Sequence, residues 1–306
     1  MHAPTGEQFL LTGTFGARRM EAVITAVAAG IRRYVVDGAY VTEPFAADAT
    51  PPFANGIVLV PWPNRVDGGR WMLHGEPQQL DLTEVGKSNA IHGLLRYTAY
   101  RATERSESSV TLAASVFPQH GYPFLLDTSV RYELSDGGLR VTHSIRNLSD
   151  APAPVAVGTH PFLRVGDTPV EELTLRVDAG TWFETDERQL PVAEHPVAGT
   201  TYDLRDGRRV GDLDLDTAFG DLRAVDGVIR HRLTAPNGHW TELWQDADFA
   251  FAQVFTPRQF PRGGAAGQAV AVEPMTAPPN ALNSGQGLRW LDPEQQWVLT
   301  WGIASG

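Results

Sequence analysis

The sequence predicts an all-β protein, a large sandwich of two broad, mostly antiparallel packed sheets. Short runs of apolar and β-branched residues, several alternating with polar ones, recur along the chain between turns that contain Gly, Asp, Asn or Pro. No capped amphipathic helix of three turns occurs, and residues 281–288 can form only a short helix. Because the composition does not shift along the 306 residues, we expect a single domain spanning 1–306.

Each expected strand is an apolar or alternating run that ends at a turn signal. The clearest is 139–148, where Leu139, Val141 and Ile145 alternate with polar residues. Asp37-Gly38 and the segment 67–69 are typical of hairpins, and Asn237-Gly238 predicts a type I′ turn. The other expected strands are 10–15, 20–28, 31–37, 56–60, 70–73, 78–83, 98–105, 109–116, 124–134, 153–157, 174–177, 181–185, 231–236, 240–245, 249–257, 269–274 and 297–303.

Composition and charge exclude several classes of protein. The net charge is −11 and no run of Lys and Arg forms a basic stripe, so we expect no nucleic-acid partner. The longest apolar run near the N-terminus, 22–30, is too short to span a bilayer and lacks signal-peptide order. We therefore expect no membrane association and a cytoplasmic location. The chain has no Cys, which excludes disulfides and thiolate chemistry.

Two titratable residues follow apolar runs and stand beside a proline. His160 lies between Gly158 and Pro161, and Glu273 directly precedes Pro274. A proline pins the neighbouring backbone, so each side chain is expected to point in a fixed direction at a strand end. A partly apolar setting can move a pKa toward neutrality, where proton transfer is most efficient. Taken alone, His160 fits a packed structural histidine better than a catalytic one, and Glu273 is equally compatible with a structural salt bridge and with proton chemistry.

Other polar residues in expected loops are Asn64, Arg65 and His92. His92 and His160 are 68 residues apart and neither has a second ligand at short spacing, so we expect no metal. GxSxG and the Gly-rich nucleotide motifs are absent, which disfavours a serine nucleophile and a nucleotide cofactor. A groove with two histidines, a carboxylate, an Asn-Arg pair and some of the eight Trp suits a neutral polyhydroxylated ligand.

Six motifs together resemble the aldose 1-epimerases, the galactose mutarotase-like proteins, over about residues 9–303. Each motif is modest alone, but their order and coverage are specific. The resemblance implies a β-supersandwich, one domain, no metal and no cofactor. The motifs are PWPNR (61–65), NAIHGLLR (89–96), GTHPFL (158–163), LDTAF (215–219), AQVFTP (252–257) and VEPMTAPPNALNSG (272–285).

The resemblance also implies roles for individual residues. Glu273 matches the general base, His160 the general acid, and His92 a second histidine that holds the sugar and polarises its ring oxygen. The positions that match substrate-binding residues are Asn64, Arg65, Asp216 and Gln253. Asp212 and Asp214 lie in the same loop as Asp216. Arg96 departs from the better-known galactose enzymes and resembles branches that act on phosphorylated or otherwise anionic sugars.

The function implied by the resemblance is interconversion of the α and β anomers of an aldohexose by acid–base catalysis through ring opening. Two alternatives stay open: a hexose-6-phosphate or other anionic-sugar epimerase, and a non-catalytic carbohydrate-binding protein. A phosphate site needs two convergent arginines, for which Arg65, Arg70, Arg96 and Arg164 are candidates. The expected partner is a small sugar, and the expected assembly is a monomer or homodimer. For catalysis, the pKa of Glu273 should lie below the working pH and that of His160 near neutrality.

Overall fold

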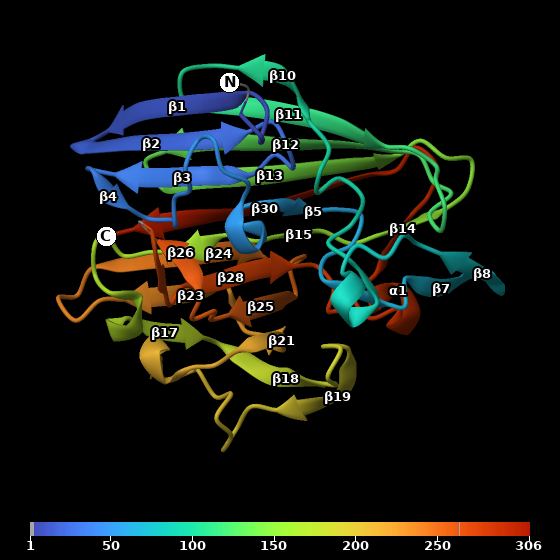
Figure 1. The fold of residues 1–306 in the computed structure, drawn as a ribbon. Coiled ribbons are helices and arrows are strands. Elements are labelled where there is room, and N and C mark those ends of the chain that lie inside the picture. The colour runs from blue at the N-terminus through green and yellow to red at the C-terminus, as the bar shows by residue number, and fades with distance from the viewer. Residues whose placement is uncertain (1–2, 263) are drawn as a thin grey trace.

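The structure, a computed structural model, describes residues 3–262 and 264–306 and consists mainly of antiparallel strands (Figure 1). The largest sheet has ten strands, and its long central hairpins come from the alternating runs seen in the sequence. In spatial order its strands are β10 (Arg101–Arg105), β11 (Ser109–Val116), β12 (Leu126–Ser135), β13 (Gly138–Asn147), β30 (Gln296–Ser305), β24 (Trp240–Asp246), β23 (Val228–Thr234), β17 (Thr174–Val177) and β20 (Arg208–Arg209), with β22 (Ala224–Val225) paired to β23.

Two further sheets form the layer that faces the ten-stranded sheet. A four-stranded sheet runs β1 (Gln8–Phe15), β2 (Arg18–Thr25), β3 (Ile31–Val36) and β4 (Ala39–Tyr40). An eight-stranded sheet runs β19 (Pro191–Pro196), β18 (Ala179–Thr185), β21 (Asp216–Leu222), β25 (Phe251–Phe255), β28 (Val270–Met275), β15 (Gly158–Thr159) and β5 (Val58–Leu59), with β16 (Phe162–Leu163) also on β28. The N–H of Ile31 donates to the Gly56 carbonyl at 3.0 Å, which ties the two sheets together.

Four two-stranded sheets and a few short helices complete the fold. The pairs are β6 (Arg65–Asp67) with β9 (Asn89–Ile91), β7 (Arg70–Leu73) with β8 (Glu76–Gln79), β14 (Ala153–Val155) with β29 (Arg289–Leu291), and β26 (Phe260–Arg262) with β27 (Ala265–Gly267). The helices are α1 (Ala281–Ser284) and the 3₁₀ turns η1 (Pro52–Ala54), η2 (Val85–Lys87), η3 (Val170–Glu172) and η4 (Val210–Asp212). In the part of the chain that is described, no helix has the length and apolar character needed to cross a membrane.

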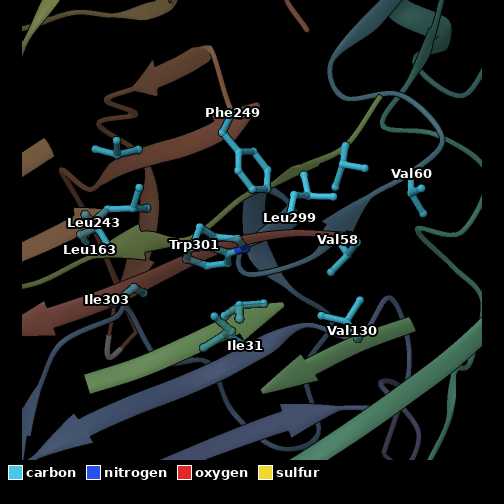
Figure 2. Packing of buried hydrophobic residues seen from close by; sticks show 14 of the residues in the cluster. Ile31, Val58, Val60, Val130, Leu163, Leu243, Phe249, Leu299, Trp301 and Ile303 are labelled. Atoms are coloured by element: carbon cyan, nitrogen blue, oxygen red, sulfur yellow. The ribbon is translucent and has the colours of Figure 1, made fainter. Parts of the chain in front are cut away.

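One hydrophobic core joins the three large sheets. Ile31 from β3, Val58 from β5, Val130 from β12 and Trp301 from β30 are at most 2% exposed and meet in the same interior (Figure 2). Burial of apolar surface at such contacts stabilises the sandwich by about 25 cal/mol per Å². The predicted all-β sandwich is confirmed, with its second layer divided between the four-stranded and the eight-stranded sheet.

The turns were predicted with mixed success. The Asp37-Gly38 hairpin is confirmed, since both residues have positive φ and join β3 to β4. The predicted hairpin at 67–69 is wrong because β6 pairs with β9 and β7 pairs with β8. The hairpin at Asn237-Gly238 is confirmed, because β23 pairs with β24 on either side of it, but the predicted type I′ turn is wrong. That turn needs positive φ at both central residues, and of the two only Gly238 has it, at 88°.

Candidate active site

Strand register in the eight-stranded sheet places His160 opposite Glu273. Gly158 of β15 pairs with Met275 at the end of β28, and Phe162 of β16 pairs with Ala271 near its beginning. Residues 159–161, between these two pairs, therefore lie opposite residues 272–274. His160 and Glu273 are the central residues of these two segments. Paired backbone hydrogen bonds fall on the flanking residues, such as Val272 N–H to the Pro161 carbonyl. A non-hydrogen-bonded pair of this kind brings side chains close, and His160 Nε2 lies 3.3 Å from Glu273 Oε1.

The backbone of His160 is fixed on the side away from β28. Its N–H donates to the Ile57 carbonyl at 3.1 Å, and its carbonyl accepts from the Gly56 N–H at 2.8 Å. Gly56 has φ 78°, and a Cβ there would lie 2.1 Å from the Ile31 carbonyl oxygen, so only glycine fits. The imidazole stacks on Phe162 with ring centroids 5.2 Å apart. These contacts leave His160 one orientation.

Glu273 lies inside β28, which corrects the prediction that it ends a strand. β28 continues through Pro274, although proline lacks an N–H to donate. The N–H groups of Val272 and Thr276 both donate away from β25, toward the segment that carries the histidine. By alternation, the nitrogen of residue 274 faces the same way, into the interval between β15 and β16. Because this nitrogen faces away from β25, the lack of an N–H in Pro274 removes no hydrogen bond between β25 and β28.

Pairing of β6 with β9 brings Asn64 and His92 together. Both have positive φ, 56° and 65°, and the His92 N–H donates to the Asn64 carbonyl at 2.9 Å. The Asn64 N–H donates to His92 Nδ1 at 3.3 Å, so the neutral ring carries its proton on Nε2. Gly93 follows with φ 71°, where a Cβ would lie 2.1 Å from the Val60 carbonyl oxygen. The His92 and His160 rings are 5.6 Å apart and perpendicular.

Arg65 is held by two carboxylates. Its Nε and Nη2 donate to Glu84 Oε2 and Oε1 at 2.8 and 3.0 Å, and its Nη2 lies 3.8 Å from Asp216 Oδ2. Asp216 begins β21 and accepts a hydrogen bond of 2.6 Å from Gln253 Nε2. Gln253 is the register partner of Glu273 on the side opposite His160. The acid–base pair therefore continues into a polar row across the sheet.

These residues surround a cavity of about 410 Å³, a size typical of small-molecule sites. Of the predicted site residues, only Gln253 is not part of its wall, and it lies behind Asp216. Asp216, and neither Asp212 nor Asp214, contributes to the wall. The lining residues are Pro51, Phe53, Ala54, Asn64, Arg65, Thr83, Glu84, Ile91, His92, Arg96, His160, Asp216, Phe255 and Glu273.

Glu84 lines the cavity but is not among the residues predicted from the sequence. Glu84 follows the expected strand 78–83 and precedes Gly86 by two residues, but no proline pins its backbone and no motif of the resemblance includes it. The pairing of β6 with β9 brings Glu84 to Arg65. A single sequence does not show which strands pair across the 19 residues that separate the two.

Of the two predicted anion-binding arginines at the cavity, Arg65 has acidic partners, and Arg96 has none within residues 3–262 and 264–306. Its Nη1 donates to the Ile91 carbonyl at 3.3 Å, and its guanidinium stacks on Tyr97 at 4.8 Å. Among the described residues no carboxylate oxygen lies within 4.0 Å of it. Arg70 and Arg164 do not line the cavity, so of the four arginines considered for a phosphate only Arg65 and Arg96 meet there.

Burial shifts the pKa values of the acid–base pair away from what the sequence analysis expected. Burial raises the pKa of Glu273 well above 4.5, and the charge of Asp216 adds to this while Arg65 opposes it. Burial also lowers the pKa of His160 to about 3. The expectation of a near-neutral pKa for His160 is therefore wrong, and burial shifts the pKa of Glu273 upward, against the expectation that it lies below the working pH.

The shifted pKa values define the protonation state of the pair. The directions of the two shifts, upward for the carboxyl group and downward for the imidazole, both favour the neutral form of the pair, with the proton on Glu273. Once ionised, a carboxylate with a raised pKa is a stronger base than usual, and an imidazolium with a lowered pKa is a stronger acid. Burial and the nearby positive groups lower the pKa of His92 well below 6.5, so that residue stays neutral and donates through Nε2.

Two buried atoms of the pair lack a partner within the described residues, His160 Nδ1 and Glu273 Oε2. Buried polar atoms without hydrogen bonds are costly and rare outside functional sites. Within residues 3–262 and 264–306, no group of three or more His, Asp or Glu side chains is arranged to hold a metal ion. The cavity walls can bind a polar ligand and can give and take one proton.

Comparisons with known proteins agree with this geometry. Residues 13–303 match the family described as aldose 1-epimerase. The uncharacterized protein YihR of Escherichia coli (strain K12) is 31% identical over 293 residues, which covers 95% of this chain and 92% of that protein.

Solved structures show the same fold at low sequence identity. An aldose epimerase homologue from Caenorhabditis elegans has a TM-score of 0.82 at 16% identity, with 98% of this chain and 99% of that chain covered. A galactose 1-epimerase from Lactobacillus acidophilus NCFM has a TM-score of 0.75 at 19% identity, with the same coverage. The similarity over almost the full length, together with the family match, shows that this chain belongs to the aldose 1-epimerase family.

Proposed function

We propose that the protein is an aldose 1-epimerase that interconverts the α and β anomers of a free aldohexose. The observation that supports this most strongly is the Glu273–His160 pair, 3.3 Å apart in the wall of a polar cavity. Binding alone does not require a base and an acid in contact. Anomer exchange requires both, since one proton leaves the O1 hydroxyl and another reaches the ring oxygen.

The reaction begins from the ionic form of the pair, carboxylate and imidazolium, which one proton transfer from Glu273 to His160 produces. Glu273 accepts the O1 proton while His160 donates its proton to the ring oxygen. The C1–O5 bond breaks, a C1 carbonyl forms, and no atom is gained or lost. Rotation about C1–C2 presents the other face of the carbonyl, and closure reverses both transfers. Each positioned transfer contributes about 10²–10⁴-fold in rate.

The other residues of the cavity bind and orient the sugar. His92 donates a hydrogen bond through Nε2 to a sugar oxygen, because Asn64 occupies its Nδ1. Arg65 and Asp216 offer a donor and an acceptor to neighbouring hydroxyl groups, the pattern that vicinal diols match. These contacts hold the anomeric centre beside the catalytic pair, which lowers the entropic part of the barrier.

A panel of pure α-anomers tests this function. Several hexoses and their 6-phosphates are dissolved, the protein is added, and equilibration is followed by polarimetry. We expect acceleration for at least one sugar, without added metal or nucleotide. No acceleration with any sugar at micromolar protein would contradict the proposal and favour a binding protein.

The second candidate function is an epimerase for a phosphorylated or otherwise anionic sugar. The observation that favours it is Arg96, a cavity guanidinium with no carboxylate within 4.0 Å among the described residues. A cation left unpaired beside a polar cavity attracts an anionic substituent. The panel separates the two candidates by the ratio of kcat/KM for each sugar and its 6-phosphate.

A further inference from the structure

Glu84 lies in the cavity wall as a fixed carboxylate. It accepts two hydrogen bonds from Arg65, through Nε at 2.8 Å and Nη2 at 3.0 Å. Asn89 Nδ2 donates a third, to Oε2 at 3.3 Å, and the backbones of Glu84 and Asn89 bond to one another in both directions. Three donors thus converge on one carboxylate, which leaves it a single orientation.

The loop that carries Glu84 is anchored from another sheet. Arg188, between β18 and β19, donates to the carbonyls of Lys87 and Ser88, each at 3.0 Å. Its own carbonyl accepts from Asn89 Nδ2 at 3.0 Å. The loop therefore cannot swing Glu84 away from Arg65 without breaking several hydrogen bonds.

The charge of Glu84 persists despite partial burial. Burial acts to raise its pKa, but the hydrogen bonds and positive charge of Arg65 outweigh this, and the pKa lies below 4.5. At neutral pH the pair is therefore an ion pair in which Glu84 occupies the Nε–Nη2 edge of the guanidinium. That edge is one of the two through which arginine binds phosphate or sulfonate with two parallel hydrogen bonds, and at the other edge Nη1 donates to Asn64 Oδ1 at 3.4 Å.

The two arginines of the cavity consequently differ in what they offer. Arg65 is neutralised by Glu84 and has Asp216 at 3.8 Å, so it is left to bind uncharged hydroxyl groups. Arg96 has no carboxylate within 4.0 Å among the described residues. An anionic group entering the cavity meets one available cation and is repelled by the carboxylate beside the other.

We propose that Glu84 sets the charge preference of the site by withholding Arg65 from anionic groups. This inference deepens the proposed function. Its kinetic consequence, a changed preference among sugar substrates, rests on that function, whereas its consequence for phosphate binding does not. Loss of the Glu84 charge leaves Arg65 only the more distant Asp216, at 3.8 Å, so Arg65 becomes a second cation of the cavity that can bind an anion, in addition to Arg96. The site then shifts toward sugars that carry a phosphate or a similar anionic group.

The test compares Glu84→Gln with wild type. The glutamine keeps an oxygen that accepts from Arg65 but carries no charge. We expect kcat/KM for a hexose 6-phosphate, relative to the parent hexose, to rise roughly fivefold or more, and inorganic phosphate to bind more tightly in calorimetry by a similar factor. Glu242→Gln is the matched control, because Glu242 is also bound by an arginine, Arg232, but lies on β24 outside the cavity.

The outcomes separate this inference from the proposed function. If wild type equilibrates no sugar, the proposed function fails, and phosphate calorimetry still tests the role of Glu84. An unchanged ratio and unchanged phosphate affinity in Glu84→Gln, or equal changes in Glu242→Gln, would overturn the inference. Arg96→Ala offers a test that leaves Glu84 intact. It should remove the phosphate affinity of the wild type, and affinity retained in that variant would show that Arg65 is already available.

Discussion

Replacing Glu273 with glutamine should lower activity and raise stability at the same time. The amide keeps the shape of the carboxyl group but cannot accept the O1 proton, so kcat should fall about 10²-fold or more. Sugar binding should persist, because the other cavity residues are unchanged. The gain in stability follows from burial, since Glu273 is 2% exposed and its pKa is raised well above 4.5.

The sign of the stability effect follows from proton linkage. The folded state holds the Glu273 proton more tightly than the unfolded state, so it binds more protons between the unfolded pKa and the raised folded pKa. The free energy of unfolding therefore falls as pH rises through this interval, by about 1.4 kcal/mol for each unit of pKa shift. The glutamine variant has no titrating group at this position, so its free energy of unfolding does not fall with pH for this reason. In a chain of this size, 1 kcal/mol corresponds to roughly 2 °C in Tm.

Thermal melts at pH 4.5 and pH 8, with polarimetry at pH 7, measure both effects. The Tm of Glu273→Gln minus that of wild type should be more positive at pH 8 than at pH 4.5. A difference in Tm that does not depend on pH would refute the argument from burial. A variant with near-normal kcat would refute the assignment of the base, and Asp216 would then be the first alternative.

Four other predictions follow from the same site. The kcat/KM profile should fall as pH rises through the raised pKa of Glu273 and persist below pH 4.5, because His160 titrates at about 3; loss of activity near pH 4.5 in folded protein would contradict this. Arg96→Ala should raise KM for an anionic sugar and spare a neutral one, and equal effects on both would leave Arg96 a structural residue. Combining Glu273→Gln with His160→Asn should cost less than the product of the single losses, since the two act in one step; full additivity would indicate separate roles. Activity should survive EDTA, and loss that a divalent ion restores would overturn the metal-free mechanism.

The long hairpins of the ten-stranded sheet were predictable from the sequence. In 139–148, apolar residues alternate with polar ones because one face of β13 packs on the core and the other is more exposed. The short strands at the site were not predictable in the same way. Residues 153–157 were expected to form one strand, but the strand ends at Val155, and beyond it the Ala156 N–H donates to the Pro61 carbonyl and the Val157 N–H to Thr276 Oγ1 instead of to β29. Every residue of β14 and β15 is buried, which leaves no alternation to read.

All candidate residues except Gln253, which lies behind Asp216, line one cavity, but their electrostatics could not be predicted from the motifs. The pKa directions of Glu273 and His160 depend on burial between β15, β16 and β28, a property of the packed sheet. Glu84 escaped notice for a related reason, since its contact with Arg65 exists only once β6 pairs with β9. A pattern of residue types therefore indicated which residues gather in the cavity, while strand pairing and burial set the electrostatic environment of each group.

Exchange NMR at anomeric equilibrium examines the proposed catalysis without the need for a pure anomer. Magnetisation transfer between the α and β anomeric protons of the preferred sugar reports the interconversion rate directly. Wild-type protein should increase this rate in proportion to its concentration, while Glu273→Gln and His160→Asn at equal concentration should reduce the increase by about 10²-fold or more. A rate that wild-type protein leaves at the buffer value for every sugar tried, or equal rates for wild type and both variants, would contradict acid–base catalysis by this pair.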